Sequence, residues 1–402
     1  MSESFIRNIP QGSITTPKGF KAAGGHCGIK RSGKKDLAII YSDAEETIAK
    51  GLFTTNTLPA APVLLSRLRL RNGRLRAVVI NSGVANACTG QQGYKNADEV
   101  TEEVANILGL KKNMVAMCST GKIGVPLPVE TIKRGLKYLS KKISSEGGHY
   151  AAEAIMTTDT REKQLAYELT LNSGKVRIGA MAKGAGMINP NMATMLALIT
   201  TDARITAVQM KKILTDAVEM SFNKINIDGD MSTNDSVIAM ANGLSEVEVR
   251  PNSADEKMFR EAFNKICLAL AEMIVRDGEG ATKFVKIKVT GAKTRKDASL
   301  AARAVSNSIL FKVALYGQNP NWGRLMDALG YSGASISADK ISVKFGDIEA
   351  VKGGVAVDDS EHLLKTYMKQ REVDILIDLS LGSCQEEILT CDIGRRYIEI
   401  NI

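Results

Sequence analysis

Short apolar runs alternate with amphipathic segments along the chain, and this alternation predicts a mixed α/β protein. Residues 76–80, 114–118 and 195–199 are brief apolar stretches, which are typical of buried strands. The first two run into polar, glycine-containing segments at 81–83 and 119–121, where we expect turns. Beyond residue 284 we expect further strands, with helices between them, over 284–290, 341–345, 373–381 and 397–400. This mixture indicates sheets packed face to face with helices outside.

Two helix starts are marked by capping boxes, in which a hydroxyl residue precedes a glutamine or glutamate by three positions. Thr206 and Gln209 open a helix with apolar residues at 210, 213, 214 and 217 on one face. Ser253 and Glu256 open another, with apolar residues at 259, 262, 263, 266, 267 and 270. Such stripes predict helices that face a core. We also expect helices over 98–108 and 128–143.

Length and composition describe a globular protein with two lobes, since 402 residues exceed one ordinary core. The net charge is +9, but the basic residues are dispersed and only 5% of residues are aromatic, so we expect no nucleic-acid partner. No apolar run approaches 18 residues and the first ten residues lack an apolar signal region. We therefore expect a cytoplasmic protein without a membrane partner. The six cysteines include no C-x-x-C pair, which favours reduced, buried thiols and no zinc site.

The segment from Lys183 to Thr200 carries the most specific chemistry. Gly184 and Gly186 allow positive φ, the Asn-Pro-Asn sequence at 189–191 is typical of a turn, and Thr194 follows just before an apolar strand. A hydroxyl held at such an edge can attack the preceding carbonyl, that of Ala193, and shift the chain from nitrogen to oxygen. Water would then split the ester and leave a second chain that begins with a free amine on Thr194.

That amine could serve as the base for its own hydroxyl, because α-amino groups have a reference pKa of about 7.7–8.0. The alternative interpretation is a loop before a core strand, with Thr194 only capping its end. The chain has three histidines, His26, His149 and His362, so few histidine-based nucleophiles are available. His26 beside Cys27 is the suggestive pair, although adjacent side chains seldom point at each other.

Other segments could complete such a site. Thr120 and Gly121 follow an apolar strand and could stabilise an oxyanion, or could form an ordinary turn. Lys183 is a cation near the loop, and residues 157–160 form a hydroxyl-rich loop. Glu279 lies at the end of a predicted helix, where a substrate ammonium would be a favourable partner. Residues 228–235 begin like a calcium loop but lack its glycine and final glutamate, so we expect no calcium.

These segments and their order resemble the ornithine acetyltransferase family, the bifunctional glutamate and amino-acid N-acetyltransferases of arginine biosynthesis. The resemblance extends over essentially the whole chain. It is carried by His26-Cys-Gly-Ile-Lys30, Cys118-Ser-Thr-Gly121, Met156-Thr-Thr-Asp159, Lys183-Gly-Ala-Gly-Met-Ile, Met192-Ala-Thr-Met-Leu196, Ser232-Thr-Asn-Asp235, Asp277-Gly-Glu-Gly-Ala-Thr-Lys283 and Asn321-Trp-Gly-Arg324.

The resemblance implies an αββα sandwich of the DmpA/ornithine acetyltransferase type, with two lobes and the site between them. It implies self-cleavage between Ala193 and Thr194 into an α chain, 1–193, and a β chain, 194–402, which fold together and assemble as an α2β2 heterotetramer. Thr194 would be the nucleophile, and Thr120 with Gly121 would form the oxyanion hole. The implied substrate contacts are Thr157, Lys183, Thr194, Glu279 and Asn401.

The implied reaction moves acetyl from N2-acetylornithine to glutamate by ping-pong chemistry through acetyl-Thr194. It needs no metal and no bound cofactor, and acetyl-CoA remains possible as a co-substrate. An amidase or aminopeptidase on the same fold, or a non-catalytic binding protein, are the alternatives. The chain departs from the family pattern at Val84 and Met231, and it ends at Ile402, short of a threonine that contacts substrate in the family.

Overall fold

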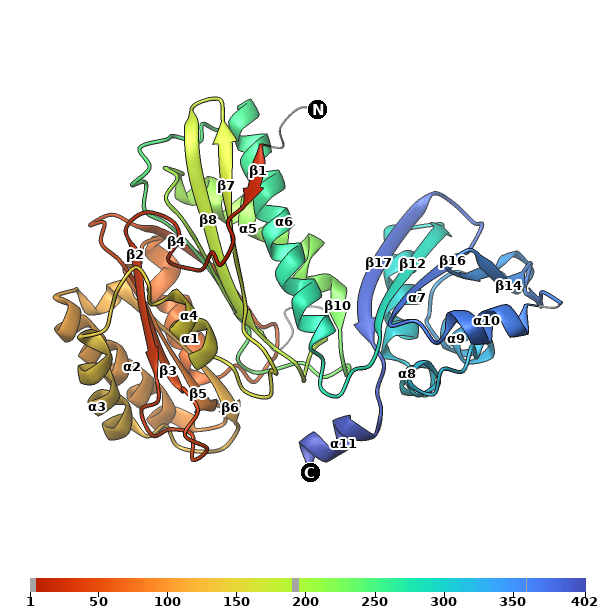
Figure 1. The fold of residues 1–402 in the computed structure, drawn as a ribbon, viewed down its shortest axis with the longest axis horizontal. Coiled ribbons are helices and arrows are strands. Elements are labelled where there is room, and N and C mark those ends of the chain that lie inside the picture. Colours follow the sequence, from red (N-terminus) through yellow and green to blue (C-terminus); the bar gives the residue numbers. More distant parts are fainter. Residues whose placement is uncertain (1–4, 190–194, 359) are drawn as a thin grey trace. The chain divides into compact units, whose positions relative to one another are not determined.

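The computed structural model describes residues 5–189, 195–358 and 360–402. The chain forms two compact units (Figure 1). The first unit comprises Met1–Gly184, Asn191–Asn223 and Met231–Ile274, and the second comprises Ala185–Pro190, Lys224–Asp230 and Val275–Ile402. Two units were expected from the length of the chain, and this prediction is confirmed.

The first unit contains two sheets. In the six-stranded sheet only the β9–β11 pair is parallel. Its order is β1 (Ile6–Asn8), β7 (Lys163–Leu171), β8 (Gly174–Lys183), β9 (Leu196–Thr201), β11 (Ser236–Ala241) and β4 (Ile48–Phe53). The four-stranded sheet has the order β2 (Phe20–Gly25), β3 (Leu37–Ser42), β5 (Ala77–Val84) and β6 (Val115–Lys122), with β5 and β6 parallel.

A shared core joins these two sheets face to face. Ile40 and Ile80 of the smaller sheet pack in one buried cluster with Leu198 and Ile238 of the larger sheet. The short helix α4 (Gly148–Ala154) adds its alanines to this cluster. Burial on both faces explains why these strands have nearly continuous apolar sequences.

Helices cover the outer faces of both sheets. Helices α2 (Gly90–Leu108) and α3 (Val129–Ser140) pack on the smaller sheet, and α1 (Ala61–Arg69) contacts β6. Helices α5 (Ala207–Met220) and α6 (Ala254–Arg276) lie on the larger sheet (Figure 1). Helix α5 contacts β4, and Lys265 of α6 lies over the ring of Tyr167 on β7. The layers are therefore helix, sheet, sheet and helix, which confirms the predicted αββα sandwich in this unit.

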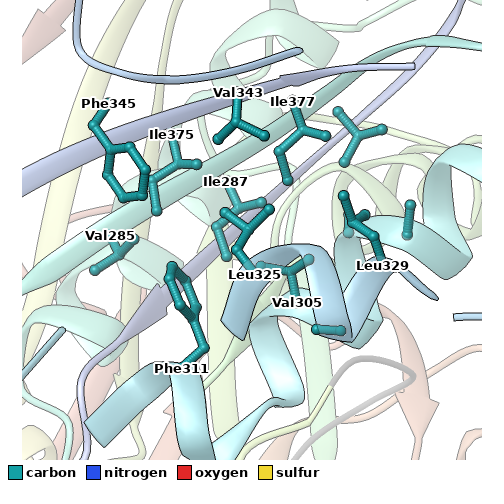
Figure 2. Close-up of a cluster of buried hydrophobic side chains, with 14 of the residues drawn as sticks. Val285, Ile287, Val305, Phe311, Leu325, Leu329, Val343, Phe345, Ile375 and Ile377 are labelled. Atoms are coloured by element: carbon teal, nitrogen blue, oxygen red, sulfur yellow. The ribbon is translucent and has the colours of Figure 1, made fainter. Parts of the chain in front are cut away.

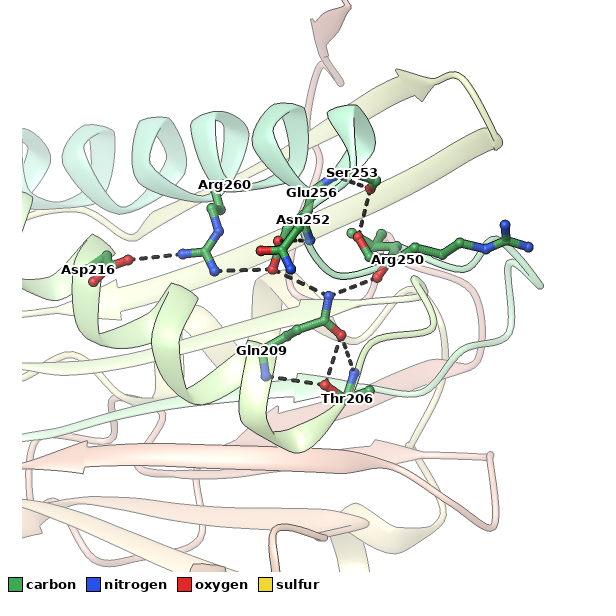
Figure 3. Close-up of polar contacts among 9 residues, drawn as sticks. Thr206, Gln209, Asp216, Arg250, Asn252, Ser253, Glu256 and Arg260 are labelled. Carbon is green, nitrogen blue, oxygen red and sulfur yellow. Dashed lines mark hydrogen bonds and ion pairs between the residues drawn. The ribbon is translucent and has the colours of Figure 1, made fainter.

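The capping prediction for α5 is confirmed, and that for α6 is partly wrong (Figure 3). The Thr206 hydroxyl accepts from the Gln209 N–H, and the Gln209 side chain accepts from the Thr206 N–H. The Ser253 hydroxyl likewise accepts from the Glu256 N–H, but the Glu256 carboxylate reaches Asn252 N at 2.7 Å instead of Ser253 N. The Gln209 amide also lies 3.4 Å from Glu256, so the two helix starts share one polar network.

The second unit is built on a seven-stranded mixed sheet. Its order is β10 (Ile225–Asn226), β17 (Cys384–Cys391), β12 (Phe284–Ala292), β16 (Glu372–Asp378), β13 (Ser342–Phe345), β14 (Ile348–Lys352) and β15 (Val355–Ala356). The helices are α7 (Arg295–Asn307), α8 (Ile309–Tyr316), α9 (Trp322–Gly330), α10 (Glu361–Tyr367) and α11 (Arg395–Asn401). Among the described residues of both units, the one-turn helices are η1 (Leu70–Asn72), η2 (Lys112–Met114), η3 (Phe222–Lys224) and η4 (Ala338–Lys340).

The core of this unit lies between the sheet and three of its helices (Figure 2). Ile287 and Ile375 of the central strands pack with Val305 of α7, Phe311 of α8 and Leu325 of α9. Within the described residues, no single helix is long and apolar enough to cross a membrane. The bent pair α7 and α8 passes that test by length and composition. Val305, Phe311 and Leu315 of this pair belong to the buried cluster, whereas Ile309, Leu310 and Val313 are exposed.

Two local predictions are wrong. Residues 397–400 were expected to form a strand but belong to helix α11, where Glu399 pairs with both Arg395 and Arg396 at helical spacing. The apolar alternation at 397–400 does not mark a buried strand face, because Ile398 is exposed. The turns expected at 81–83 and 119–121 are also absent, because β5 and β6 continue as paired strands to Val84 and Lys122.

Candidate active site

The predicted oxyanion residues lie at the carboxyl end of β6, beside the parallel strand β5. Gly121 has φ of +130°, and a Cβ built on it would lie 2.3 Å from the carbonyl carbon of Gly83. Only glycine allows both this conformation and this close approach. The ladder shifts register at Gly83 and Val84, and this irregularity lets the strands continue where a turn was expected.

The hydroxyl of Thr120 is oriented by Lys183. Lys183 is the last residue of β8, and its Nζ donates to Thr120 Oγ1 at 3.3 Å. Both side chains are buried, with residue exposures of 5% for Thr120 and 3% for Lys183. Because an ammonium can only donate, the hydroxyl proton of Thr120 points away from Lys183 and is available to another acceptor.

Two asparagines hold the strand end that carries Thr120. Asn234 Nδ2 donates to the carbonyl oxygens of Ser119, at 2.9 Å, and Ala85, at 2.7 Å. Asn81 Oδ1 accepts from the Ser119 hydroxyl at 2.5 Å. Buried, satisfied polar contacts of this kind fix the backbone next to the oxyanion residues. The sequence alone offered no sign of these contacts, because they join segments far apart in the chain.

Asp159 is a buried carboxylate that links three segments, and it was not among the predicted site residues. Its Oδ1 accepts from Lys163 Nζ at 2.7 Å and from Gly184 N at 2.8 Å, and its Oδ2 accepts from Thr157 N at 2.9 Å. Burial alone would raise the pKa of the Asp159 carboxyl, but the charges of Lys183 and Lys163 and these hydrogen bonds hold it well below its usual range. The predicted contact residue Thr157 is thereby tied to the end of β8.

Lys30 holds the residue that precedes Thr157. Its Nζ donates to the carbonyl oxygens of Lys35, at 2.8 Å, and Met156, at 2.6 Å. Burial lowers the pKa of Lys30 to about 8, partly offset by the charge of Asp36. The buried Lys30 ammonium therefore fixes the backbone of Met156.

Ala193 and Thr194, the predicted cleavage site and nucleophile, lie outside the described residues. The residue that follows them is described: Met195 is buried, and its N–H donates to Asp235 Oδ1 at 3.0 Å. The strand predicted at 195–199 is confirmed as β9. Asp235 directly precedes β11, the parallel neighbour of β9.

Glu279 and Asn401 come together in the second unit. Asn401 Nδ2 donates to Glu279 Oε2 at 2.7 Å, and Glu279 N donates to the carbonyl oxygen of Ala185 at 2.8 Å. Glu279 is 8% exposed, whereas Asn401 is exposed. The prediction that Glu279 follows a helix is confirmed, since α6 ends at Arg276.

Gly184 and Gly186, the two glycines that follow β8, have different roles. Gly184 has a φ of +156°, as expected, but Gly186 does not adopt positive φ. A Cβ on Gly186 would instead lie 2.5 Å from the carboxyl carbon of Glu279. Gly186 is therefore needed for close approach of the carboxylate, and Met187 takes the positive φ, at +58°.

Asp228 organises the residues that follow Gly186. Its Oδ1 accepts from Ile188 N at 2.9 Å, and its Oδ2 accepts from Met187 N and from the Tyr397 hydroxyl, the latter at 3.3 Å. In the segment 228–235, Asp228 therefore fixes the backbone of Met187 and Ile188. Among the described residues, no group of three or more His, Cys, Asp or Glu side chains could hold a metal ion.

The alternative nucleophile Cys27 is not activated. Burial raises the pKa of its thiol to about 12, with a further contribution from the charge of Asp36, so the thiol stays protonated near neutrality. His26 Nδ1 contacts the Lys34 carbonyl oxygen at 3.0 Å and Asp36 Oδ2 at 3.3 Å. All six cysteines are free, as predicted, but not all are buried: Cys88 is exposed.

Comparison with known proteins gives one consistent result. The ArgJ family model matches residues 21–402. The arginine biosynthesis bifunctional protein ArgJ of Symbiobacterium thermophilum is 45% identical over 393 residues, covering 97% of this chain and 98% of that protein. The protein of the same name from Caldanaerobacter subterraneus is 42% identical over 398 residues, covering 98% of each.

Among solved structures, ornithine acetyltransferase from Mycobacterium tuberculosis, complexed with ornithine, is 42% identical to this chain. The match has a TM-score of 0.44 and covers 46% of this chain and 98% of that one.

A buried hydroxyl and the N–H of an adjacent glycine at a strand end can stabilise the oxyanion that forms during acyl transfer. The chain belongs to the ArgJ family and is an acetyltransferase of arginine biosynthesis.

Proposed function

We propose that the enzyme cleaves itself between Ala193 and Thr194 and then moves acetyl from N2-acetylornithine to glutamate through acetyl-Thr194. The observation that carries this proposal is the Thr120 hydroxyl at the end of β6, which accepts from Lys183 and keeps its own proton available. That proton and the Gly121 N–H are suited to a developing oxyanion, where one such donor contributes roughly 3–4 kcal/mol.

In the first half-reaction, Thr194 Oγ attacks the acetyl carbonyl carbon while its α-amine takes the hydroxyl proton. The tetrahedral intermediate places its negative oxygen on Thr120 and Gly121. The bond between the acetyl carbon and the ornithine nitrogen breaks, and that nitrogen takes the proton from the Thr194 ammonium. Ornithine leaves, and acetyl-Thr194 remains as an ester.

In the second half-reaction, the amine of glutamate attacks this ester by the same path and N-acetylglutamate leaves. Lys183 supplies positive charge for a substrate carboxylate, and Thr157 lies in the adjoining loop. Glu279, held by Asn401, supplies negative charge for the ornithine side-chain ammonium. Acetyl-CoA is a possible second donor, and the chemistry calls for no metal or bound cofactor. The resemblance further supports a cytoplasmic heterotetramer of two α and two β chains.

The test is to incubate the purified enzyme with N2-acetylornithine, with and without glutamate, and to follow ornithine and N-acetylglutamate. Without glutamate we expect about one ornithine per active site, with acetyl-Thr194 visible by mass spectrometry, and with glutamate we expect continued turnover. Ornithine release that ignores glutamate would support the amidase alternative, and the absence of both reactions would support a binding protein. Replacing acetylornithine by acetyl-CoA shows whether the second donor is used.

A further inference from the structure

A pocket of about 580 Å³ lies in the first unit, at the outer edge of the smaller sheet. Strand β2 is the edge strand, and Gly24 and Gly25 at its end line the pocket. The side chains that line it with them include those of His26, Lys35, Tyr138, Lys142, Ser144 and Tyr150. The volume is typical of pockets that bind small ligands. The chemistry described above uses none of these residues.

The two glycines let helices approach both faces of the strand (Figure 1). A Cβ on Gly24 would lie 2.0 Å from the Tyr150 carbonyl oxygen of α4, and a Cβ on Gly25 would lie 2.9 Å from Leu139 Cδ2 of α3. Successive residues of a strand point to opposite faces, so α3 and α4 lie on opposite sides of β2. The pocket therefore has one tyrosine from each helix, Tyr138 and Tyr150.

The edge of β2 offers backbone groups to the same pocket. Ala22 and Ser144 exchange two backbone hydrogen bonds, of 2.9 and 3.0 Å, on the outer side of the strand. Backbone groups two residues apart point to the same side of a strand. Gly24 therefore directs its N–H and its carbonyl oxygen outward, on the side where the pocket lies.

The pocket combines ring surface with positive charge. Lys142 Nζ donates to the Tyr138 hydroxyl and lies 4.1 Å from the centroid of its ring, and no carboxylate among the described residues pairs with Lys142. Lys35 Nζ lies 5.4 Å from the centroid of the Tyr150 ring and pairs with Glu153. Tyr138 is 51% and Tyr150 55% exposed, so ring surface remains free for a ligand. A flat, anionic molecule fits this combination.

The pocket and the oxyanion residues lie on one sheet, at the same end of parallel-running strands. One row of paired residues crosses that sheet, and it consists of Gly25, Leu37, Asn81 and Ser119. Neighbouring strands are about 4.8 Å apart, so Gly25 lies roughly 14 Å from Ser119. Ser119 directly precedes Thr120, whose hydroxyl is the proposed oxyanion donor.

We propose that this pocket binds the nucleotide end of acetyl-CoA. The assignment rests on the proposed function, in which acetyl-CoA is the second donor and Thr120 with Gly121 holds the oxyanion. The adenine ring of CoA has flat faces that stack on tyrosine, and its edge carries a donor and an acceptor for the backbone of Gly24. The phosphate groups of CoA are anions that the ammonium groups of Lys142 and Lys35 attract.

The length of CoA matches this placement. Its arm runs from the diphosphate to the thioester sulfur through about twelve covalent bonds, as many as four residues contain, and spans about 14 Å when extended. An arm of this length reaches from the pocket to Thr120. The acetyl carbon–sulfur bond breaks there, and CoA leaves as a thiol with the proton that the nucleophile loses. N2-acetylornithine has neither nucleotide nor arm, so the pocket serves one donor only.

The test measures acetyl transfer to glutamate from acetyl-CoA, from acetyl-pantetheine and from N2-acetylornithine. Acetyl-pantetheine keeps the arm and the thioester but lacks the nucleotide. In Tyr150→Ala and Lys142→Ala we expect KM for acetyl-CoA to rise by about tenfold, since a stacked ring or a phosphate contact is lost. KM for the other two donors should keep its wild-type value.

Tyr150→Phe and Lys141→Ala are the matched controls. Phenylalanine keeps the ring, so KM for acetyl-CoA should return to its wild-type value. Lys141 is an exposed neighbour of Lys142 that does not line the pocket, so its loss should leave all three donors unaffected. Melting temperatures of all four variants should stay close to that of the wild type, because the substituted side chains are exposed.

Adenosine 3′,5′-bisphosphate probes the pocket without chemistry. It should compete with acetyl-CoA in the wild type, bind more weakly to Lys142→Ala in calorimetry, and leave transfer from N2-acetylornithine unaffected. Inhibition of both donors to the same extent would overturn the assignment, because the nucleotide would then bind where acetylornithine binds.

The remaining outcomes separate the pocket from the proposed function. An unchanged KM for acetyl-CoA in both alanine variants, or an equal rise for all three donors, would overturn the role of the pocket. A wild type that uses N2-acetylornithine but neither thioester would overturn the second donor and the pocket together, while transfer from acetylornithine stands. A wild type that is inactive with every donor would overturn the proposed function itself.

Discussion

A lysine ammonium can only donate hydrogen bonds, so Lys183 determines how the Thr120 hydroxyl acts. The same ammonium is the charge that the proposed function gives to a substrate carboxylate. Its burial makes each contact stronger than it would be in water. In the proposed function, Lys183 therefore both binds the substrate carboxylate and orients the Thr120 hydroxyl.

Lys183→Ala should raise KM for N2-acetylornithine by about one to two orders of magnitude, because a hydrogen bond to a charged group contributes roughly 1.5–3 kcal/mol. The processed fraction must be measured first, since the substitution flanks the cleavage loop. Lys175→Ala is the control, because Lys175 lies on the same strand but is exposed and pairs with Glu168 at the surface. An unchanged KM in fully processed Lys183→Ala would contradict the binding role.

Gly186→Ala tests the placement of Glu279. The added Cβ would stand 2.5 Å from the carboxyl carbon, so the carboxylate must move. We expect KM for N2-acetylornithine to rise by about tenfold or more, because small displacements of a binding group are costly. Gly330→Ala, whose Cβ would meet nothing within 4 Å, should leave KM unchanged. Steady-state kinetics on both variants measures these values. A KM for Gly186→Ala equal to that of the wild type would mean that Glu279 does not bind this substrate.

At the scale of elements, Asp159 ties together the loop before β7, the start of β7 and the end of β8. Asp159→Asn leaves the buried ammonium of Lys163 without its carboxylate partner. Removing one member of a buried ion pair costs about 3–5 kcal/mol, so the free energy of unfolding should fall by that amount at neutral pH. Urea denaturation measures it. Glu361→Gln, which breaks an exposed pair with Lys365, should leave the free energy of unfolding nearly unchanged.

The effect of Asp159 depends on pH. Its pKa is lowered in the folded state, so its stabilisation is present above the unfolded pKa of about 3.9 and is lost as pH falls below that value. The difference in unfolding free energy between wild type and Asp159→Asn should therefore shrink on acidification below about pH 4. A difference that stays constant down to pH 2 would contradict the assigned charge state.

For the whole molecule, long amphipathic segments were predictable from the sequence and contacts between distant segments were not. All six apolar positions predicted for the core face of α6 are buried, because a long periodic stripe fixes which face turns inward. The four residues at 397–400 were assigned wrongly, since a segment so short fits a strand or a helix equally well. The close approaches of Gly121 to Gly83 and of Gly186 to Glu279 have no counterpart in sequence spacing.

The candidate site shows the same division between what motifs indicate and what folding brings together. Thr120, Gly121, Lys183 and Glu279 were candidates because each carries chemistry at a strand or helix end, and Thr157 because it lies in a hydroxyl-rich loop. Asp235 and Asn234 act through hydrogen bonds that only the folded chain creates. Buried polar groups must find partners, but the sequence does not say which ones.

The central claim is that Thr194 becomes a chain terminus and then carries the acetyl group. Intact mass and amino-terminal sequencing of the purified enzyme test it most directly, with Thr194→Ala as the control. The account predicts two chains, residues 1–193 and 194–402, with threonine leading the second, and a Thr194→Ala protein that stays whole and inactive. A single uncut chain that transfers acetyl groups would contradict the account, because the amine proposed as the base would not exist.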